Sequence, residues 1–429
     1  MGDRFMMTEA IKASYDVVIV GGGHAGAQVA IALRQRKFAG TIAIIGDEIY
    51  PPYERPPLSK DYLAGVKSFE RILIRPESFW SEREVALLLG MTVVAVAAEA
   101  KHVDLADGQR VGYRHLIWAA GGVPRRLNCQ GADLGGVHSV RSRADVDQMM
   151  SELPRVTRVV VIGGGYIGLE AAAVLSKFGK AVTVLEAQDR VLARVAGEPL
   201  SRFYEAEHRS HGVDIRLGVT VDHIEERDGI ASGVRLADGS LLECDMVIVG
   251  IGIVPTVRPL IDAGADGDAG VLVNEYCMTS LDDVYAIGDC ATHRNHYADG
   301  TLIRLESVQN ANDQALTVAK LLTGTRDIYD AVPWFWSNQY DLRLQTIGLS
   351  SGYDEVVMRG SSADRAFSVI YLREGRVIAL DCVNSTRDYA QGRALVLQRA
   401  AVAHDLLSDA ALQLKDFAVD RREAGLSLG

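Results

Sequence analysis

The chain has 429 residues, of which 48% are hydrophobic and 24% charged, the composition of a globular protein long enough for two or three domains. Its net charge of −11 argues against a general nucleic-acid binder, whose affinity comes from basic surface that neutralises phosphates. Because no apolar run is long enough to cross a bilayer, we expect no membrane association. Residues 1–14 lack the apolar core of a signal peptide, and we expect them to form a disordered tail.

The first predicted element after this tail is a strand over residues 17–20, in YDVVIV, that runs into a glycine-rich turn and a helix over residues 27–33. The turn has the pattern G-x-G-x-x-G, at Gly21, Gly23 and Gly26. Its glycines allow a tight turn, a close approach of backbone N–H groups to a pyrophosphate, and close packing of helix on strand. The next strand, TIAIIGDE, ends on Asp47 and Glu48, where a carboxylate can accept hydrogen bonds from a ribose. This segment predicts a dinucleotide site.

A short proline-stiffened loop comes next, YPPYERPPLSK, over residues 50–60. Four of the chain's eleven prolines fall within it, and it ends on Lys60. Because proline restricts φ, such a loop loses less entropy when it becomes ordered. The composition alone is also that of an extended linker or of a docking peptide for a partner domain.

The strand–turn–helix pattern occurs a second time, with a strand over residues 159–162 and a helix over residues 169–178. The glycines of this turn are Gly163, Gly165 and Gly168. The following strand ends on Glu186, close to the spacing expected for the acid that binds a ribose. A carboxylate there accepts hydrogen bonds from both ribose hydroxyls and repels a 2′-phosphate. We therefore expect NADH to be preferred to NADPH.

Two dinucleotide sites on one chain indicate electron transfer between FAD and a nicotinamide. Two further strands, in HLIWAAGGVPRRL and in DMVIVGIGIVPTV, each run into a glycine turn, one before and one after the second site. Their paired positions predict that the chain crosses there from a first domain into an inserted second domain and back.

A third nucleotide-type element, TSLDDVYAIGDCA, has a predicted strand over residues 284–287. Gly288 frees the backbone so that Asp289 can point at a polyol. A helix is predicted over residues 310–322, and its positive N-terminal end could stabilise the anion of a reduced flavin.

The cysteines and histidines do not form a metal-binding pattern. No C-x-x-C occurs, so neither a disulfide framework nor a zinc site is predicted, and a reducing cytoplasm fits the five scattered cysteines. For HRSH at residues 208–211 and HRNH at residues 293–296, no nearby cysteine or acidic residue completes a shell of ligands at metal-site spacing. We interpret both pairs as surface histidines and expect no metal.

Together, GGGHAG, PPLSKDYLAG, GGGYIGLE, VGIGIVP, VYAIGDCA, RLESVQNA and PWFWSNQYDLRLQTIGL resemble the NADH-dependent ferredoxin reductases of oxygenase systems, of the putidaredoxin reductase type, among the glutathione-reductase-like flavoproteins. The resemblance implies an α/β fold of two Rossmann-like dinucleotide-binding domains, the NAD domain inserted in the FAD domain, and a C-terminal α+β domain near the flavin. It places the FAD domain at residues 15–123 and 254–328, the NADH domain at residues 124–253 and the C-terminal domain at residues 329–429.

The resemblance also implies the cofactor contacts. Those with FAD fall on or beside the first glycine turn and on later motifs, at Gly21, Gly23, Ala25, Gly26, Asp47, Glu48, Lys60, Val93, Arg141, Asp289 and Val308. Those with NADH fall on Gly163, Gly165, Tyr166, Ile167, Gly168, Glu186 and Glu306. Trp336 resembles the aromatic residue at the flavin edge, although the run Trp334–Trp336 could instead be an apolar wedge in a domain interface. One departure is Ala119-Ala120-Gly121, where the family has Ala-Thr-Gly, which puts one local hydrogen bond in doubt.

Related flavoproteins that reduce disulfides carry a reactive cysteine in the stretch after the first turn and its helix. Here that stretch is the proline loop, and residues 1–128 contain no cysteine, which argues against thiol chemistry. Hydride transfer from NADH to the flavin, followed by one-electron steps, remains. The resemblance pairs Lys60 with Glu170, and burial together would keep the ammonium charged and oriented near the flavin. The alternative is that Lys60 is a solvated loop lysine.

The expected function is that of a cytoplasmic, FAD-dependent NADH:ferredoxin reductase. Its expected partner is a [2Fe–2S] ferredoxin that supplies a cytochrome P450 or a dioxygenase, and the cluster belongs to the partner because this chain has no four-cysteine spacing. Two alternatives stay open: a rubredoxin reductase, and a redox-sensing interaction protein that binds NADH and FAD without turnover.

Overall fold

The computed structural model describes residues 12–418 and divides into two compact units. The segments of the first unit are residues up to Arg55, Lys67–Val123 and Ile253–Ala331. Those of the second unit are Pro56–Val66, Pro124–Gly252 and the chain from Val332 onward. The predicted disordered tail lies outside the described residues except for residues 12–14, of which Ser14 already begins a strand.

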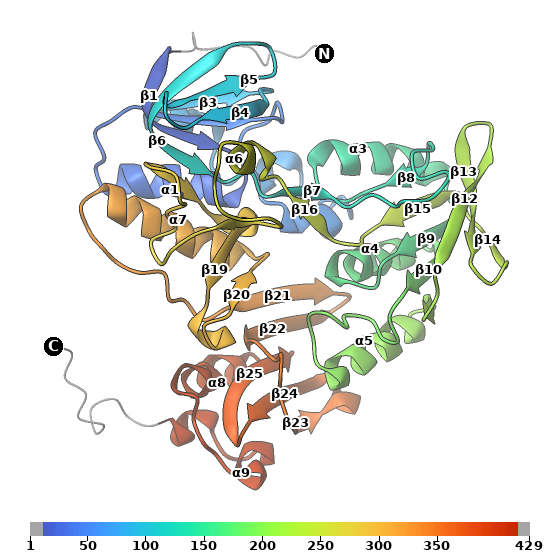
Figure 1. Cartoon of the computed structure of the whole chain (residues 1–429). Helices are drawn as coiled ribbons and strands as arrows, with labels where there is room; N and C mark the ends of the chain where they lie inside the picture. Colours follow the sequence, from blue (N-terminus) through green and yellow to red (C-terminus); the bar gives the residue numbers. More distant parts are fainter. Residues whose placement is uncertain (1–11, 419–429) are drawn as a thin grey trace. The chain divides into compact units, whose positions relative to one another are not determined.

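The first unit contains a seven-stranded sheet in the order β3–β2–β1–β6–β5–β4, with β18 paired to β6 (Figure 1). Its strands are β1 (Ser14–Val20), β2 (Ile42–Gly46), β3 (Val85–Leu89), β4 (Val93–Ala97), β5 (His102–Leu105), β6 (Arg110–Trp118) and β18 (Val284–Ala286). β1 lies parallel to β2 and β6, with Val18 opposite Ala43 and Leu116. β2 and residues 17–20 of β1 are buried, and both are continuous apolar runs, as expected of parallel strands that are covered on both faces.

Two helices, α1 (His24–Gln35) and α7 (Val308–Leu322), pack against each other (Figure 1) and share a buried cluster with β1 and β2. α7 begins two residues before its predicted start because the Ser307 hydroxyl accepts the Asn310 N–H and caps it. The other elements of this unit are α2 (Glu77–Glu82), α6 (Arg258–Asp262), β17 (Val271–Leu272), β19 (Ala291–Arg294) and β20 (Leu302–Arg304).

The chain passes between the units at two short strands that pair with each other, β7 (Gly122–Pro124) and β16 (Ile253–Pro255). The boundaries of the units fall at Val123 and at Ile253. Both strands lie in the two glycine-containing segments where the sequence predicts the crossings.

The inserted part of the second unit has a five-stranded sheet in the order β11–β10–β9–β15–β8 and a three-stranded sheet in the order β12–β13–β14. The strands are β8 (Val137–His138), β9 (Arg158–Ile162), β10 (Ala181–Glu186), β11 (Asp214–Leu217), β12 (Val221–Arg227), β13 (Ile230–Leu236), β14 (Leu241–Glu243) and β15 (Met246–Val249). The helices are α3 (Arg143–Glu152), α4 (Tyr166–Lys177) and α5 (Glu198–Ser210). β9 is parallel to β10 and β15, which repeats the arrangement around β1.

The C-terminal part of the second unit has an antiparallel sheet in the order β21–β22–β25–β24–β23, with two helices. These elements are β21 (Trp334–Gln339), β22 (Leu342–Gly348), β23 (Glu355–Ser361), β24 (Ala366–Arg373), β25 (Arg376–Val383), α8 (Thr386–Gln398) and α9 (His404–Ser408). α4 packs against the edge strand β21. Along β21, Ser337 and Gln339 are buried and Asn338 is exposed, the alternation expected of a strand with one covered face.

Candidate functional site

The first glycine turn joins β1 to α1 in a shape that few residues other than glycine can adopt. Gly21 has φ +111°, and its N–H donates to the Ile45 carbonyl at 2.7 Å. A Cβ on Gly26 would lie 1.9 Å from the Gly21 carbonyl oxygen, so a larger residue would push helix and turn apart. Gly23 caps α1 without a side-chain hydrogen bond, so the helix N-terminus presents backbone N–H groups that fit a phosphate.

The two acids after β2 have different surroundings. The end of β2 lies beside the turn, because a Cβ on Gly46 would be 3.7 Å from the Gly22 nitrogen. Asp47 is exposed, whereas the Glu48 carboxylate accepts a hydrogen bond from the Tyr53 hydroxyl at 2.6 Å and pairs with Arg55 at 2.8 Å. Glu48 therefore holds the first half of the proline loop, and Asp47 remains the predicted ribose ligand.

Asp289 lies next to the first glycine turn. It follows Gly288, which has φ +77°, and a Cβ on Gly288 would be 3.2 Å from the Ala25 Cβ. The Gly288 N–H donates to Gln314 on α7 at 2.7 Å, which fixes the short turn. The neighbouring Arg304 donates to the Asp289 carbonyl at 2.8 Å. The structure thus brings two of the predicted FAD segments together within the first unit.

Three further residues for which a cofactor contact is predicted also lie in the first unit. Val308 is the first residue of α7, the helix whose Gln314 side chain accepts the Gly288 N–H. Glu306 forms an ion pair with Arg304 at 2.7 Å. The Val93 side chain is buried in the apolar cluster behind the sheet, so any contact with a cofactor would come from its backbone.

The second glycine turn repeats this geometry in the second unit. Gly163 has φ +111°, and a Cβ on Gly168 would lie 2.1 Å from the Gly163 carbonyl oxygen. Glu186 reaches this turn: its Oε2 accepts the Gly164 N–H at 2.7 Å and its Oε1 accepts the Gln188 N–H at 2.9 Å. A carboxylate has about four acceptor positions, so it retains capacity for ribose hydroxyls.

The start of α4 carries the other predicted NADH contacts. Gly165 caps this helix without a side-chain hydrogen bond, and Ile167 is 44% exposed although it is apolar. The Tyr166 ring lies 4.6 Å from the Phe335 ring, centroid to centroid. The helix N-terminus and its exposed apolar side chain fit a nucleotide.

The Lys60 ammonium lies 2.9 Å from Glu170 Oε2 in the second unit, and only 15% and 4% of the two side chains are exposed. Lys60 directly follows the 3-10 turn Pro56–Ser59, whose Pro57 carbonyl accepts the Lys60 N–H at 3.0 Å. Glu170 comes from the second turn of α4. The lysine of the proline loop is therefore paired and mostly buried.

Two serines complete the surroundings of Glu170. Ser59 Oγ donates to Oε2 at 2.5 Å, and Ser337 Oγ donates to Oε1 at 2.6 Å. Sequence reasoning missed both. Ser59 could have been found because it precedes Lys60 in the loop, but no local pattern links Ser337 on β21 to Glu170.

Arg141 and Trp336 also lie in the second unit. The Arg141 backbone N–H donates to Asp145 at 3.1 Å, just before α3. Trp336 is half-buried on β21, and its ring lies 5.6 Å from that of Trp334. The predicted flavin contacts of both residues remain predictions, as does the alternative apolar wedge.

The prediction that both histidine pairs lie at the surface is wrong for one member of each. His208 is fully buried and His293 is 2% exposed, whereas His211 and His296 are exposed. His208 lies one helical turn after the buried Tyr204, on the inner face of α5. Burial lowers the pKa of His208 and of His293 to about 4. Within residues 12–418, no group of three His, Cys, Asp or Glu side chains could hold a metal ion.

Comparison with known proteins gives matches over nearly the whole chain. The family model described as pyridine nucleotide-disulphide oxidoreductase matches residues 15–315, and one described as reductase C-terminal matches residues 334–418. The 5,5′-dehydrodivanillate O-demethylase ferredoxin reductase subunit of a Sphingobium strain is 60% identical over 94% of this chain and 98% of its own.

Two solved structures are also similar. The ferredoxin reductase for the CYP199A2 system from Rhodopseudomonas palustris has a TM-score of 0.91 and 39% identity, over 95% of this chain and 100% of its own. The covalent putidaredoxin reductase–putidaredoxin complex has a TM-score of 0.90 and 38% identity, over 95% of this chain and 98% of its own. These matches confirm the predicted fold class. No helix within residues 12–418 is long and apolar enough to cross a membrane.

Proposed function

This chain belongs to the pyridine nucleotide-disulphide oxidoreductase family and is a ferredoxin reductase, and from that premise we propose that it transfers electrons from NADH through bound FAD to a [2Fe–2S] ferredoxin serving a cytochrome P450 or another oxygenase. One observation carries the proposal. The segment after α1 presents the Lys60–Glu170 ion pair and no thiol, since residues 1–128 contain no cysteine. An electron path that needs no protein disulfide fits this arrangement.

The residues of the first glycine turn fit FAD. Gly23 leaves the cap of α1 open to a pyrophosphate, Asp47 is exposed at the end of β2, and Asp289 lies beside the turn. Bound FAD would supply the conversion of a two-electron hydride into single electrons. The protein would supply the binding, the orientation and the local charge.

Glu186 supports the proposed preference for NADH. Its carboxylate accepts the N–H of Gly164 in the second glycine turn and the N–H of Gln188 just after β10, so its negative charge is fixed where a ribose would bind. Such a carboxylate accepts hydrogen bonds from ribose hydroxyls and repels a 2′-phosphate.

Lys60 is the proposed source of positive charge at the flavin. Glu170 accepts hydrogen bonds from Lys60, Ser59 and Ser337, so both carboxylate oxygens are engaged and the carboxylate holds the ammonium in one direction. An ammonium held in place by a hydrogen-bonded carboxylate would offset the negative charge that arrives with a hydride.

We also place the protein in the cytoplasm, where NADH is available. All five cysteines are free thiols within the described residues, which supports a reducing compartment.

A steady-state panel tests the proposed function. Purified [2Fe–2S] ferredoxins and rubredoxins serve as acceptors with NADH and NADPH as donors, and cytochrome c reports electron transfer with and without ferredoxin. We expect fast NADH-dependent cytochrome c reduction only when a ferredoxin is added. Preference for rubredoxin would replace the ferredoxin assignment, and slow reduction of every acceptor with a long-lived flavin–NAD complex would indicate the redox-sensing protein.

A further inference from the structure

The Lys60–Glu170 pair is the inner end of a longer chain of buried hydrogen bonds in the second unit. Ser337 Oγ donates to Glu170 Oε1 at 2.6 Å, and Gln339 Nε2 donates to Ser337 Oγ at 3.2 Å. Gln339 Oε1 lies 2.8 Å from His208 Nε2, and His208 Nδ1 lies 3.0 Å from the Tyr340 hydroxyl. Ser337, Gln339 and His208 are each at most 1% exposed.

The carboxylate determines the direction of every bond in this chain. Lys60 can only donate, so Glu170 accepts, and the single proton of Ser337 must point at Glu170 Oε1. The Gln339 atom that faces Ser337 is then its NH₂ group, and its carbonyl faces His208.

His208 must therefore carry its proton on Nε2, and its Nδ1 accepts from Tyr340. Burial lowers the pKa of His208 to about 4, although the hydrogen bond to Gln339 opposes this, so the ring is neutral at physiological pH. A neutral ring with one protonated nitrogen is what the chain requires.

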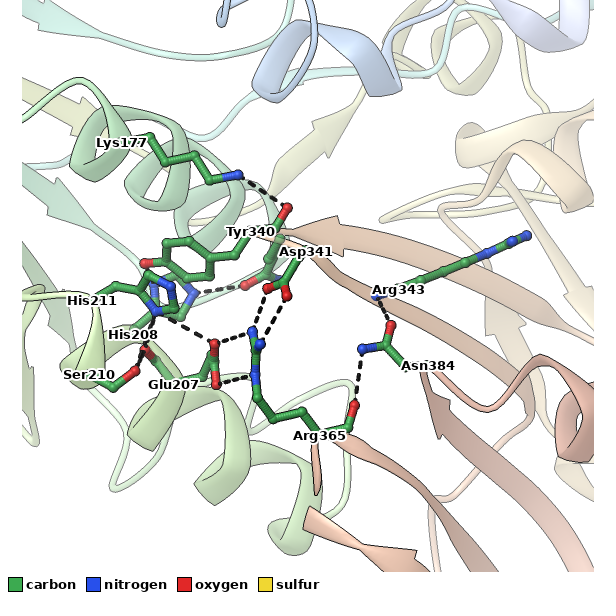
Figure 2. Close-up of polar contacts among 11 residues, drawn as sticks. Lys177, Glu207, His208, Ser210, His211, Tyr340, Asp341, Arg343, Arg365 and Asn384 are labelled. Atoms are coloured by element: carbon green, nitrogen blue, oxygen red, sulfur yellow. Dashed lines mark hydrogen bonds and ion pairs between the residues drawn. The ribbon is translucent and has the colours of Figure 1, made fainter. Parts of the chain in front are cut away.

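The outer end of the chain is anchored where α5 meets the loop after β21 (Figure 2). The His211 ring stacks on the Tyr340 ring with centroids 3.7 Å apart. Lys177 Nζ donates to the Tyr340 carbonyl at 3.1 Å. Nearby, Arg365 joins Glu207 on α5 to Asp341. These contacts fix Tyr340, and through it the ring of His208.

We propose that Ser337, Gln339 and His208 are positioning residues that orient Glu170, so that Oε1 is engaged by Ser337 and Oε2 faces Lys60. The proposal rests on the proposed function, because it takes the Lys60 ammonium as the charge that acts at the flavin. Without the Ser337 hydrogen bond, the carboxylate can rotate about its terminal bond, which is torsionally soft. The ammonium would then be held less firmly.

Ser368 offers a matched control in the same sheet. Like Ser337 it is fully buried on a strand of the C-terminal sheet, and its hydroxyl donates to a carboxylate, Asp388, at 3.0 Å. Ser368→Ala thus removes a buried serine–carboxylate hydrogen bond that lies outside the chain of hydrogen bonds leading to Lys60. A comparison of Ser337→Ala with Ser368→Ala separates a loss of local stability from a loss of the positioning of Glu170.

The test uses the FAD-loaded protein and a double-mutant cycle. Ser337→Ala and Gln339→Met are each made alone and combined with Lys60→Met, and flavin reduction by NADH is followed by anaerobic stopped-flow. We expect Ser337→Ala to slow reduction by about 10-fold, the size of one lost charge-assisted hydrogen bond, and Gln339→Met, which removes hydrogen bonds between neutral groups, to slow reduction by a smaller factor. In the Lys60→Met background neither Ser337→Ala nor Gln339→Met should slow flavin reduction further, because a positioning residue acts only through the residue it positions.

Two readouts other than rate complete the experiment. Long-range ¹H–¹⁵N spectra of the histidine rings should show His208 protonated on Nε2. The flavin midpoint potential should become more negative in Lys60→Met. In Ser337→Ala it should shift in the same direction by a smaller amount, and in Ser368→Ala it should stay at the wild-type value. A His208 ring protonated on Nδ1 would overturn the direction of the chain.

The outcomes distinguish the two proposals. If Lys60→Met itself reduces at the wild-type rate and potential, the role of Lys60 is wrong and the positioning chain with it. If Lys60→Met is slow but Ser337→Ala and Gln339→Met match Ser368→Ala, only the positioning chain is overturned. Should Ser337→Ala lose FAD or fail to fold, Gln339→Met decides the question one bond farther out.

Discussion

The Lys60 ammonium and the Glu170 carboxylate lie 2.9 Å apart in the second unit, mostly shielded from water. Charges in such surroundings are screened much less than exposed ones. The proline loop therefore delivers a fixed positive charge rather than a mobile surface lysine.

Lys60→Met should slow flavin reduction by NADH by about 100-fold, the effect of removing one preorganised electrostatic group from a reacting centre. Anaerobic stopped-flow at the flavin absorbance band measures it. Lys67→Met removes a lysine charge from the same stretch of chain and should leave the rate unchanged. Equal rates for wild type and Lys60→Met would reduce the ion pair to a structural role.

Gly26→Ala should weaken FAD binding by about 10-fold or more, because overpacking a closed site costs upward of 1 kcal/mol. Its Cβ would lie 1.9 Å from the Gly21 carbonyl oxygen, which is backbone and cannot swing away. A Cβ on Gly22, in contrast, meets nothing within 4 Å. Fluorescence titration with FAD compares the Gly26→Ala apoprotein with the Gly22→Ala apoprotein, and equal FAD affinities of the two variants would contradict the packing argument.

Glu186→Gln should raise the KM for NADH by about 10-fold and narrow the preference over NADPH, because a charged acceptor for the ribose is lost. Steady-state kinetics with both donors measure the change. Glu198→Gln removes an exposed carboxylate at the start of α5 and serves as the control. An unchanged NADH to NADPH ratio in Glu186→Gln would remove Glu186 from the ribose site.

Asp381 predicts a pH-dependent stability. Burial raises the pKa of this carboxyl to about 7, although the Tyr371 hydroxyl donates to it at 2.6 Å and opposes the rise. The folded protein therefore holds this proton between about pH 4 and pH 7 while the unfolded chain does not. The contribution of this bound proton to the stability of the folded protein is fully present below about pH 4 and is lost as the pH rises to about 7.

Asp381→Asn cannot ionise, so its melting temperature relative to wild type should increase from pH 5 to pH 8. Thermal melts across this range measure the difference, with Asp364→Asn, at an exposed carboxyl, as the control. A constant difference between Asp381→Asn and wild type would show that Asp381 does not titrate in this window.

Local motifs predict the parts of the site that local backbone geometry determines. Gly21 and Gly163 can be predicted because a tight turn between strand and helix needs glycine, and Glu186 because a strand end at fixed spacing reaches that turn. The Lys60–Glu170 pair could be predicted from family resemblance. The start of α7 was missed by two residues because the Ser307 cap outweighs helix propensity.

The positioning chain could not be predicted in this way. Ser337, Gln339 and His208 each bind a partner more than a hundred residues away in the sequence, and no periodic pattern encodes such a pairing. His208 and His211 lie three residues apart in one HRSH segment, and only the tertiary packing of α5 decides which of the two rings is buried. Burial turns an ordinary HRSH segment into part of a polar network.

A single-turnover experiment tests the central claim most directly. The FAD-loaded protein is reduced with one equivalent of NADH without oxygen and then mixed with an oxidised [2Fe–2S] ferredoxin. We predict that the visible absorbance of the ferredoxin cluster bleaches as the flavin reoxidises, with two ferredoxins reduced for each NADH consumed. A flavin that stays reduced in the presence of ferredoxin, yet reoxidises with rubredoxin or not at all, would contradict the account.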